Sequence, residues 1–126
     1  MSLATFRTVN NPVTGIFGNG NQQWFTSSGT FNVPPGINAV RVRMWGGGAS
    51  CSSNYGSAGG FALKTIYDLA GATSVTVTVG AGGSSGSTSG GTSSFGSYVS
   101  ATGGIYDSTN ANPAGGTGSG GDINNT

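Results

Sequence analysis

"VRVRMWGGGAS", residues 40–50, joins two kinds of sequence that recur along this chain. Aliphatic residues alternate with arginine and tryptophan from Val40 to Trp45, which is the period-2 pattern of a β-strand with one buried face. Three glycines follow at once, and glycine is depleted in strands. The stretch therefore predicts a core strand that ends at a glycine-rich segment. Arg41 and Arg43 are expected to cover the outer face of the sheet rather than to bind an anion.

Further stretches repeat the β-type pattern, and no window has helical periodicity. The most regular is Ser74 to Val79, where valines and threonines take opposite faces. The other expected strands cover residues 22–26, 30–33, 61–67 and 92–102, the last broken near Gly96. The sequence predicts an all-β fold, a small antiparallel β-sandwich of jelly-roll-like form.

Long glycine-rich segments begin at residues 46, 80 and 103. If consecutive strands are antiparallel, all of these segments lie at the same end of the sandwich, and only short turns lie at the other. Connections longer than about 12 residues are uncommon unless they are functional or disordered. No returning strand is evident after Gly103, so we expect the domain to be truncated within its last glycine-rich loop.

The glycine runs allow two physical interpretations. In the first interpretation they are flexible linkers, because glycine has the largest backbone entropy to lose on ordering. Alternatively they are ordered polyproline II-type helices that pack side by side through backbone hydrogen bonds, within one chain or between copies of an oligomer. On the second interpretation the packing residues are Gly46, Gly47, Gly48, Gly59, Gly60, Gly80, Gly82, Gly83, Gly103, Gly104, Gly120 and Gly121.

The length of 126 residues suits one domain, and the composition is unusually poor in charge. Only 6% of residues are charged and the net charge is +1, so glycine and small polar residues must supply solubility. The expected β-domain covers residues 22–126. Residues 1–21 form an N-terminal arm, with Phe6 and Phe17 as apolar anchors that would dock onto another surface.

Several function classes are not expected from this composition. Too few basic residues are present to neutralise a row of phosphates, which argues against nucleic-acid binding. No apolar run is long enough for membrane insertion. The chain has no histidine, no glutamate and a single cysteine, Cys51, so no catalytic base, metal site or cofactor is expected. The Gly80–Ser85 loop lacks the following helix that a dinucleotide site needs. We expect a protein that is not an enzyme.

Two tyrosines in the glycine-rich loops are the candidate contact residues. Tyr55 lies beside Asn54, and Tyr106 lies near Asp107 and Asn110. Flat aromatic faces next to hydrogen-bonding groups suit sugars or weakly charged protein surfaces. Alternatively, each tyrosine packs over its own loop or against a neighbouring subunit.

The order of these motifs resembles the glycine-rich domain found in bacteriophage tail proteins, including tail fibres and host-recognition adhesins. The resemblance covers roughly residues 22–124. It rests on "SGTFNVPPGINAVRVRMWGGGAS", "GGFALKTI", "TSVTVTVGAGG", "GGTSSFGSYVSATGG" and "GGTGSGGDIN" as an ordered set. It implies a small β-sandwich with glycine-rich loops in a virion component that is not an enzyme. Such a protein is made in the host cytoplasm and resides in the virion tail.

These observations leave three functional hypotheses. The first is a homotrimeric tail fibre or tail-tip protein, bound to other virion tail proteins, whose glycine end contacts a host surface glycan or outer-membrane protein. The second is a purely structural tail or capsid component without host contact. The third is a carbohydrate-binding module outside any virus.

Overall fold

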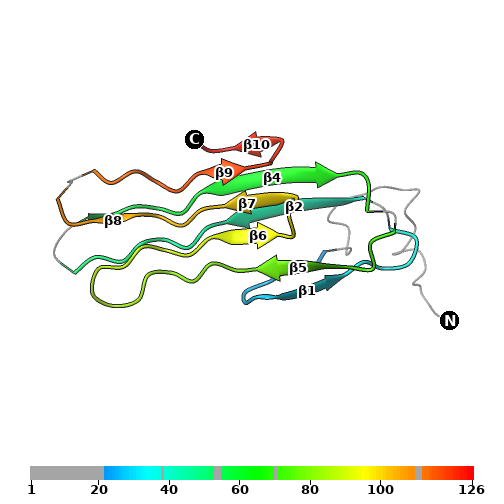
Figure 1. The fold of residues 1–126 in the computed structure, drawn as a ribbon, viewed down its shortest axis with the longest axis horizontal. Helices are drawn as coiled ribbons and strands as arrows, with labels where there is room; N and C mark the ends of the chain where they lie inside the picture. The colour runs from blue at the N-terminus through cyan, green and yellow to red at the C-terminus, as the bar shows by residue number, and fades with distance from the viewer. Residues whose placement is uncertain (1–21, 38, 53–54, 70, 110–111) are drawn as a thin grey trace.

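The computed structural model describes residues 22–37, 39–52, 55–69, 71–109 and 112–126. Within these ranges every regular element is a β-strand, and all strand pairs are antiparallel. The all-β antiparallel fold expected from the sequence is therefore confirmed. Figure 1 shows most strands gathered in one half of the molecule, with long extended segments reaching away from them. Among the described residues, no helix is long and apolar enough to cross a membrane.

The strands form two stacked sheets and a separate small pair. The bounds are β1 Gly29–Asn32, β2 Val40–Trp45, β3 Tyr55–Gly56, β4 Phe61–Ile66, β5 Ser74–Thr78, β6 Ser93–Phe95, β7 Val99–Ala101, β8 Tyr106–Asp107, β9 Gly118–Ser119 and β10 Ile123–Asn124. The larger sheet has the order β1-β5-β6-β7-β9, and the smaller sheet has the order β10-β4-β2. Strands β3 and β8 pair apart from both sheets. The two main sheets make a small sandwich.

Alternation along the strands decides which face of each sheet is buried. In β5, Val75 and Val77 are buried, while Ser74, Thr76 and Thr78, which alternate with them, are exposed. In β2, Met44 is buried and the two arginines are exposed on the opposite face. The apolar residues of both sheets thus meet between the layers, where burying apolar surface is favourable. The core consists of Met44, Ala62, Ile66, Leu69, Val75, Val77, Phe95, Val99 and Ala101.

Two expectations about strands are wrong. Residues 22–26 form no strand, since the first paired strand of the described chain is β1, which pairs with β5 rather than with its nearest neighbour in sequence. The segment after Gly103 does return, because β9 pairs with β7 and β10 pairs with β4. The sequence concealed these strands because each has only two residues. Side chains supplement the backbone bonds of β10, and Asp122 accepts a hydrogen bond from the Thr65 N–H at 2.7 Å.

The turn after β4 contributes the largest fully buried side chain. Leu69 is 1% exposed although the sequence pattern places it in a turn between polar and small residues. The Ala72 N–H donates to the Leu69 carbonyl at 2.9 Å, and Gly71 has a φ of 91°, a left-handed conformation that glycine tolerates. The tight turn therefore directs Leu69 into the core.

Substitution of Leu69 by alanine tests this assignment. We expect Leu69→Ala to lower the free energy of unfolding by about 2–5 kcal/mol, because it removes buried methyl groups and leaves a cavity. Tyr67, two residues away and 77% exposed, provides the control. We expect Tyr67→Ala to change stability by no more than about 0.5 kcal/mol. Equal urea midpoints for Leu69→Ala and the parent protein would contradict the assignment.

Candidate functional site

The glycine-rich connections are ordered and form one bundle of six extended segments. In chain order these segments, named first to sixth, cover residues 46–50, 57–60, 80–83, 88–91, 102–105 and 114–117. They lie outside the sheets and run between the strands and the far end of the molecule (Figure 1). All of the long glycine segments therefore lie at one end of the sandwich, as the antiparallel reasoning predicts.

Hydrogen bonds of the first segment repeat every three residues. Gly46 and Ala49 donate their N–H groups to the second segment, at 2.9 and 3.0 Å. Gly47 and Ser50 donate to the fourth segment, both at 2.9 Å. A polyproline II-type helix has three residues per turn and no internal hydrogen bonds, so every third N–H faces the same neighbour. Of the two interpretations of the glycine runs, this periodicity matches ordered packing, here within one chain.

Contacts between the segments define two rows of three. One row has the order third, first, second, and the other has the order fourth, fifth, sixth. Backbone hydrogen bonds of 2.8–2.9 Å hold each row together, and these include the N–H groups of Gly83, Gly90 and Thr102 donating to the carbonyls of Gly48, Gly104 and Thr117. Bonds of the same length join the two rows, from the N–H groups of Gly91, Gly60, Gly104 and Gly116 to the carbonyls of Ala81, Thr102, Gly47 and Ala58. The bundle therefore supplies backbone partners in place of a side-chain core.

Close approach between backbones explains why these segments are made of glycine. A Cβ added at Gly47 would lie 2.0 Å from the Ala81 carbonyl oxygen, and one at Gly90 would lie 1.9 Å from the Gly47 carbonyl oxygen. Real Cβ atoms essentially never come within 3.0 Å of such an atom. An added Cβ would also lie less than 2.7 Å from a neighbouring backbone atom at Gly46, Gly59, Gly60, Gly80, Gly83, Gly103, Gly104 and Gly116.

Not every glycine proposed from the sequence has this role. A Cβ at Gly48 would meet no heavy atom within 4 Å, and one at Gly82 would approach only to 3.9 Å. Gly120 and Gly121 lie in the turn between β9 and β10 instead of in the bundle. Conversely, sequence reasoning missed Gly90 and Gly116, where an added Cβ would lie 1.9 and 2.3 Å from a backbone oxygen. The sequence signal for each was its place in a Gly-Gly pair, Gly90-Gly91 and Gly115-Gly116.

Ser93 joins the bundle to the sandwich. This side chain is the buried polar one of the described residues, and it lies at the start of β6. Its hydroxyl donates to the Trp45 carbonyl at 2.7 Å and accepts from the Gly80 N–H at 2.9 Å. Both groups stand where a strand passes into a glycine segment. The hydroxyl thus satisfies two backbone groups that would otherwise be left unpaired beside the core.

Strands β3 and β8 pair at the far end of the bundle and bring the candidate tyrosines together. Tyr55 stands opposite Asp107, and Gly56 stands opposite Tyr106. The Tyr55 side chain is 54% exposed. The Asp107 carboxylate accepts hydrogen bonds from the N–H and the hydroxyl of Thr109, both at 2.8 Å.

Side-chain hydroxyls connect the loops of this end to one another. The Tyr106 N–H donates to the Ser89 hydroxyl at 3.0 Å, and the hydroxyls of Ser52 and Ser87 lie 3.4 Å apart. Ser50 also donates to the Ser84 carbonyl. We call the described residues 51–52, 55–56, 84–87, 106–109 and 112–113 the tip. Loops of the tip are thus bonded in pairs, residues 51–52 with 84–87 and β3 with β8, and Ser50 and Ser89 fasten them to the bundle.

The remaining residues singled out from the sequence are four that the structure does not describe and Cys51 of the tip. Asn54 and Asn110 lie outside the described residues, as do the arm anchors Phe6 and Phe17. Cys51 is an exposed free thiol. Across the described ranges, no group of three or more histidine, cysteine, aspartate or glutamate residues could hold a metal ion.

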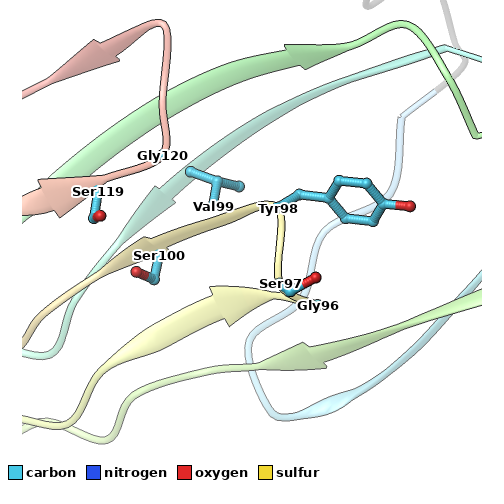
Figure 2. A pocket seen from close by; sticks show the side chains of 7 residues that line it. All are labelled: Gly96, Ser97, Tyr98, Val99, Ser100, Ser119 and Gly120. Atoms are coloured by element: carbon cyan, nitrogen blue, oxygen red, sulfur yellow. The ribbon is translucent and has the colours of Figure 1, made fainter.

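A small hollow lies at the turn between β6 and β7, away from the tip. Its volume is about 140 Å³, and it is lined by Gly96, Ser97, Tyr98, Val99, Ser100, Ser119 and Gly120. Figure 2 shows the Tyr98 ring pointing away from the Ser100 and Ser119 hydroxyls, so the aromatic ring and these polar groups do not converge on one point. The hollow offers space for a few waters rather than a ligand cleft.

Comparison with known families agrees with this architecture. Residues 26–126 match the model of a family described as glycine-rich domain. The chain therefore belongs to the glycine-rich domain family. No curated protein and no solved structure matches the chain.

Adjacent glycines of the opening stretch provide a test of the bundle. We expect Gly47→Ala to lower the free energy of unfolding by about 3 kcal/mol, since overpacking costs about 1–3 kcal/mol and here a backbone segment must move. We expect Gly48→Ala to change it by less than about 1 kcal/mol, because its Cβ points into open space. Urea denaturation measures both values. Equal losses would show that the bundle does not pack as described.

Proposed function

We propose that this chain is a structural protein of a bacteriophage tail, a tail fibre or tail-tip component that attaches to the host through the tip. Family membership supplies the glycine-rich domain and no role beyond it. The finer assignment to a phage tail rests on the ordered set of motifs that resembles tail proteins. In this proposal the chain resides in the virion tail and has a binding and structural role instead of a catalytic one.

The observation that carries the proposal is the position of the tip. The tip loops are bonded in pairs and to the ends of the bundle, which holds them away from the sandwich. A preorganised surface loses little conformational entropy on binding, which favours affinity. The half-exposed Tyr55 ring and the Ser52, Ser87 and Thr109 hydroxyls of the tip suit a weakly charged host glycan or outer-membrane protein.

Paired tyrosine substitutions at opposite ends of the molecule test host attachment. We expect Tyr55→Ala to lower the affinity of the purified protein for host cells about tenfold, because a central exposed aromatic ring is a typical hot-spot residue. Tyr67→Ala is the control, because Tyr67 is more exposed than Tyr55 and follows the end of β4 that points away from the bundle. This substitution should leave binding unchanged. Binding of labelled protein to cells, measured by flow cytometry, gives both affinities.

Pre-treatment of the cells identifies the receptor class. Loss of binding after periodate oxidation indicates a glycan, and loss after protease treatment indicates an outer-membrane protein. If the parent protein does not bind host cells and tip substitutions leave particles infectious, host attachment is excluded. The chain would then act as a joint within the tail.

A homotrimeric assembly is part of the proposal. The sandwich core is small, and the arm carries apolar residues that gain from a neighbouring surface. We expect light scattering to give three times the 12.3 kDa mass of one chain at micromolar concentration. A mass of one chain under these conditions would contradict the trimer.

A further inference from the structure

The outer face of the smaller sheet carries aromatic and cationic side chains side by side. Every second residue of β2 and β4 points to this face, and strand register places them in direct opposition. We call it the aromatic–arginine face. Its pairs are Arg41 with Thr65, Arg43 with Leu63, Trp45 with Phe61, and Ile123 of β10 with Leu63.

Aromatic surface is available at the end of this face that adjoins the bundle. The Trp45 and Phe61 rings contact each other with centroids 5.2 Å apart and planes tilted by 50°. Trp45 nevertheless remains 56% exposed, and Ile123 remains 59% exposed. Phe61 therefore holds Trp45 in place while much of the indole stays open to solvent. An exposed apolar cluster of this kind is characteristic of a binding surface.

Positive charge lies next to the aromatic pair. Arg41 and Arg43 are both exposed and stand two residues apart on β2, so their Cα atoms are separated by about 7 Å. The Arg41 Nε lies 3.4 Å from the Thr65 hydroxyl, which orients one guanidinium over the face. Of the described aspartates, Asp107 is at the tip and Asp68 follows β4, while Asp122 accepts the Thr65 N–H at the Arg41 end of the face. Arg43 and Trp45 lie toward the other end of β2.

Charge complementarity selects the partner. A symmetric contact between two copies through this face would bring like-charged arginines together, which is unfavourable. An anionic partner avoids this cost, because a guanidinium donates two parallel hydrogen bonds to a carboxylate or phosphate. The exposed indole also requires a partner with a flat apolar surface, which a pyranose ring supplies and a simple anion does not.

We propose that the aromatic–arginine face binds an acidic polysaccharide, a sugar chain that carries carboxylate or phosphate groups. Trp45 stacks on a sugar ring, and Arg43 bonds the acidic group of the neighbouring unit. The sequence alone assigned the arginines only a covering role. The placement of Trp45 and Phe61 on the same face changes that assignment. This site is separate from the tip, and the inference does not depend on the proposed tail function.

The opposite side of the sandwich provides an internal contrast. The outer face of the larger sheet bears a row of hydroxyls in register across four strands, namely Thr78, Ser94, Ser100 and Ser119. These side chains are neutral and lack a neighbouring exposed aromatic ring on their strands. Binding of an acidic sugar is therefore expected on one side of the sandwich only.

Oligogalacturonate is a suitable probe because its methyl ester has the same sugar backbone without charge. Trp24→Ala makes Trp45 the sole tryptophan, so its fluorescence reports directly on this face. We expect oligogalacturonate to quench this fluorescence saturably at low salt. Screening of charge should weaken binding as salt rises. The methyl ester should bind about tenfold more weakly or not at all, since it offers no carboxylate to the arginines.

Variants separate stacking from charge by calorimetry. We expect Trp45→Ala and Arg43→Gln each to lower the affinity for oligogalacturonate about tenfold. Arg43→Lys keeps the charge but loses the paired hydrogen bonds, and should have an intermediate affinity. Trp24→Ala is the matched control, because Trp24 is 72% exposed but precedes the larger sheet, and it should bind like the parent.

Three results would overturn the proposal. The first is equal affinity for the ester and the acid. The second is binding of polyglutamate as tightly as oligogalacturonate, which would reduce the site to unspecific charge. The third is unchanged binding by Trp45→Ala with a native urea midpoint. A Tyr55→Ala variant should bind the acidic sugar normally, and this result separates the face from the tip.

Discussion

The absence of Cβ atoms in the bundle is the constraint on which the rest of the structure depends. Six segments approach so closely that the backbone N–H of one reaches the carbonyl of another, and an added methyl group at Gly47 or Gly90 would overlap that carbonyl. Each such hydrogen bond contributes only about 1 kcal/mol net to stability, but a donor or acceptor left unpaired inside the bundle would cost about 1–3 kcal/mol. Order in this half of the molecule thus comes from mutual backbone satisfaction. A chain that is 34% hydrophobic can be ordered well beyond its small side-chain core.

The bundle and the sandwich require each other. Glycine loses more conformational entropy on ordering than other residues, so isolated glycine segments would not associate in water. The antiparallel strands remove part of this cost, because they deliver the ends of neighbouring segments already aligned. In return, the segments fasten strands as short as β9, which has two residues. Ser93 stands at the border, where its hydroxyl bonds both the Trp45 carbonyl and the Gly80 N–H.

Features that depend on local alternation were predictable from the sequence, whereas those that depend on tertiary contacts were not. The stretch Val40 to Trp45 forms β2 as expected, and the glycine segments share one end. Leu69 looked like a turn residue because nothing local distinguishes a leucine that a turn points inward. Gly47 and Gly48 look identical in sequence, yet only Gly47 faces a neighbouring carbonyl. Pairing of the candidate residues Tyr55 and Asp107 required the three-dimensional path of two loops.

The tip and strand β2 differ in how far their residues tolerate substitution. Most bonds between the bundle segments are made by backbone groups, and the hydroxyls of Ser50, Ser57 and Thr102 supplement them. Exposed side chains of the tip are therefore able to differ without removing these bonds. The aromatic–arginine face lacks this freedom, since Trp45 and the arginines belong to β2, whose alternate residues build the core. A substitution of an exposed tip side chain such as Tyr55 alters the surface alone. A substitution along β2 is constrained by the buried partner residues on either side of it, because a shift of one residue in register would exchange the two faces of the strand.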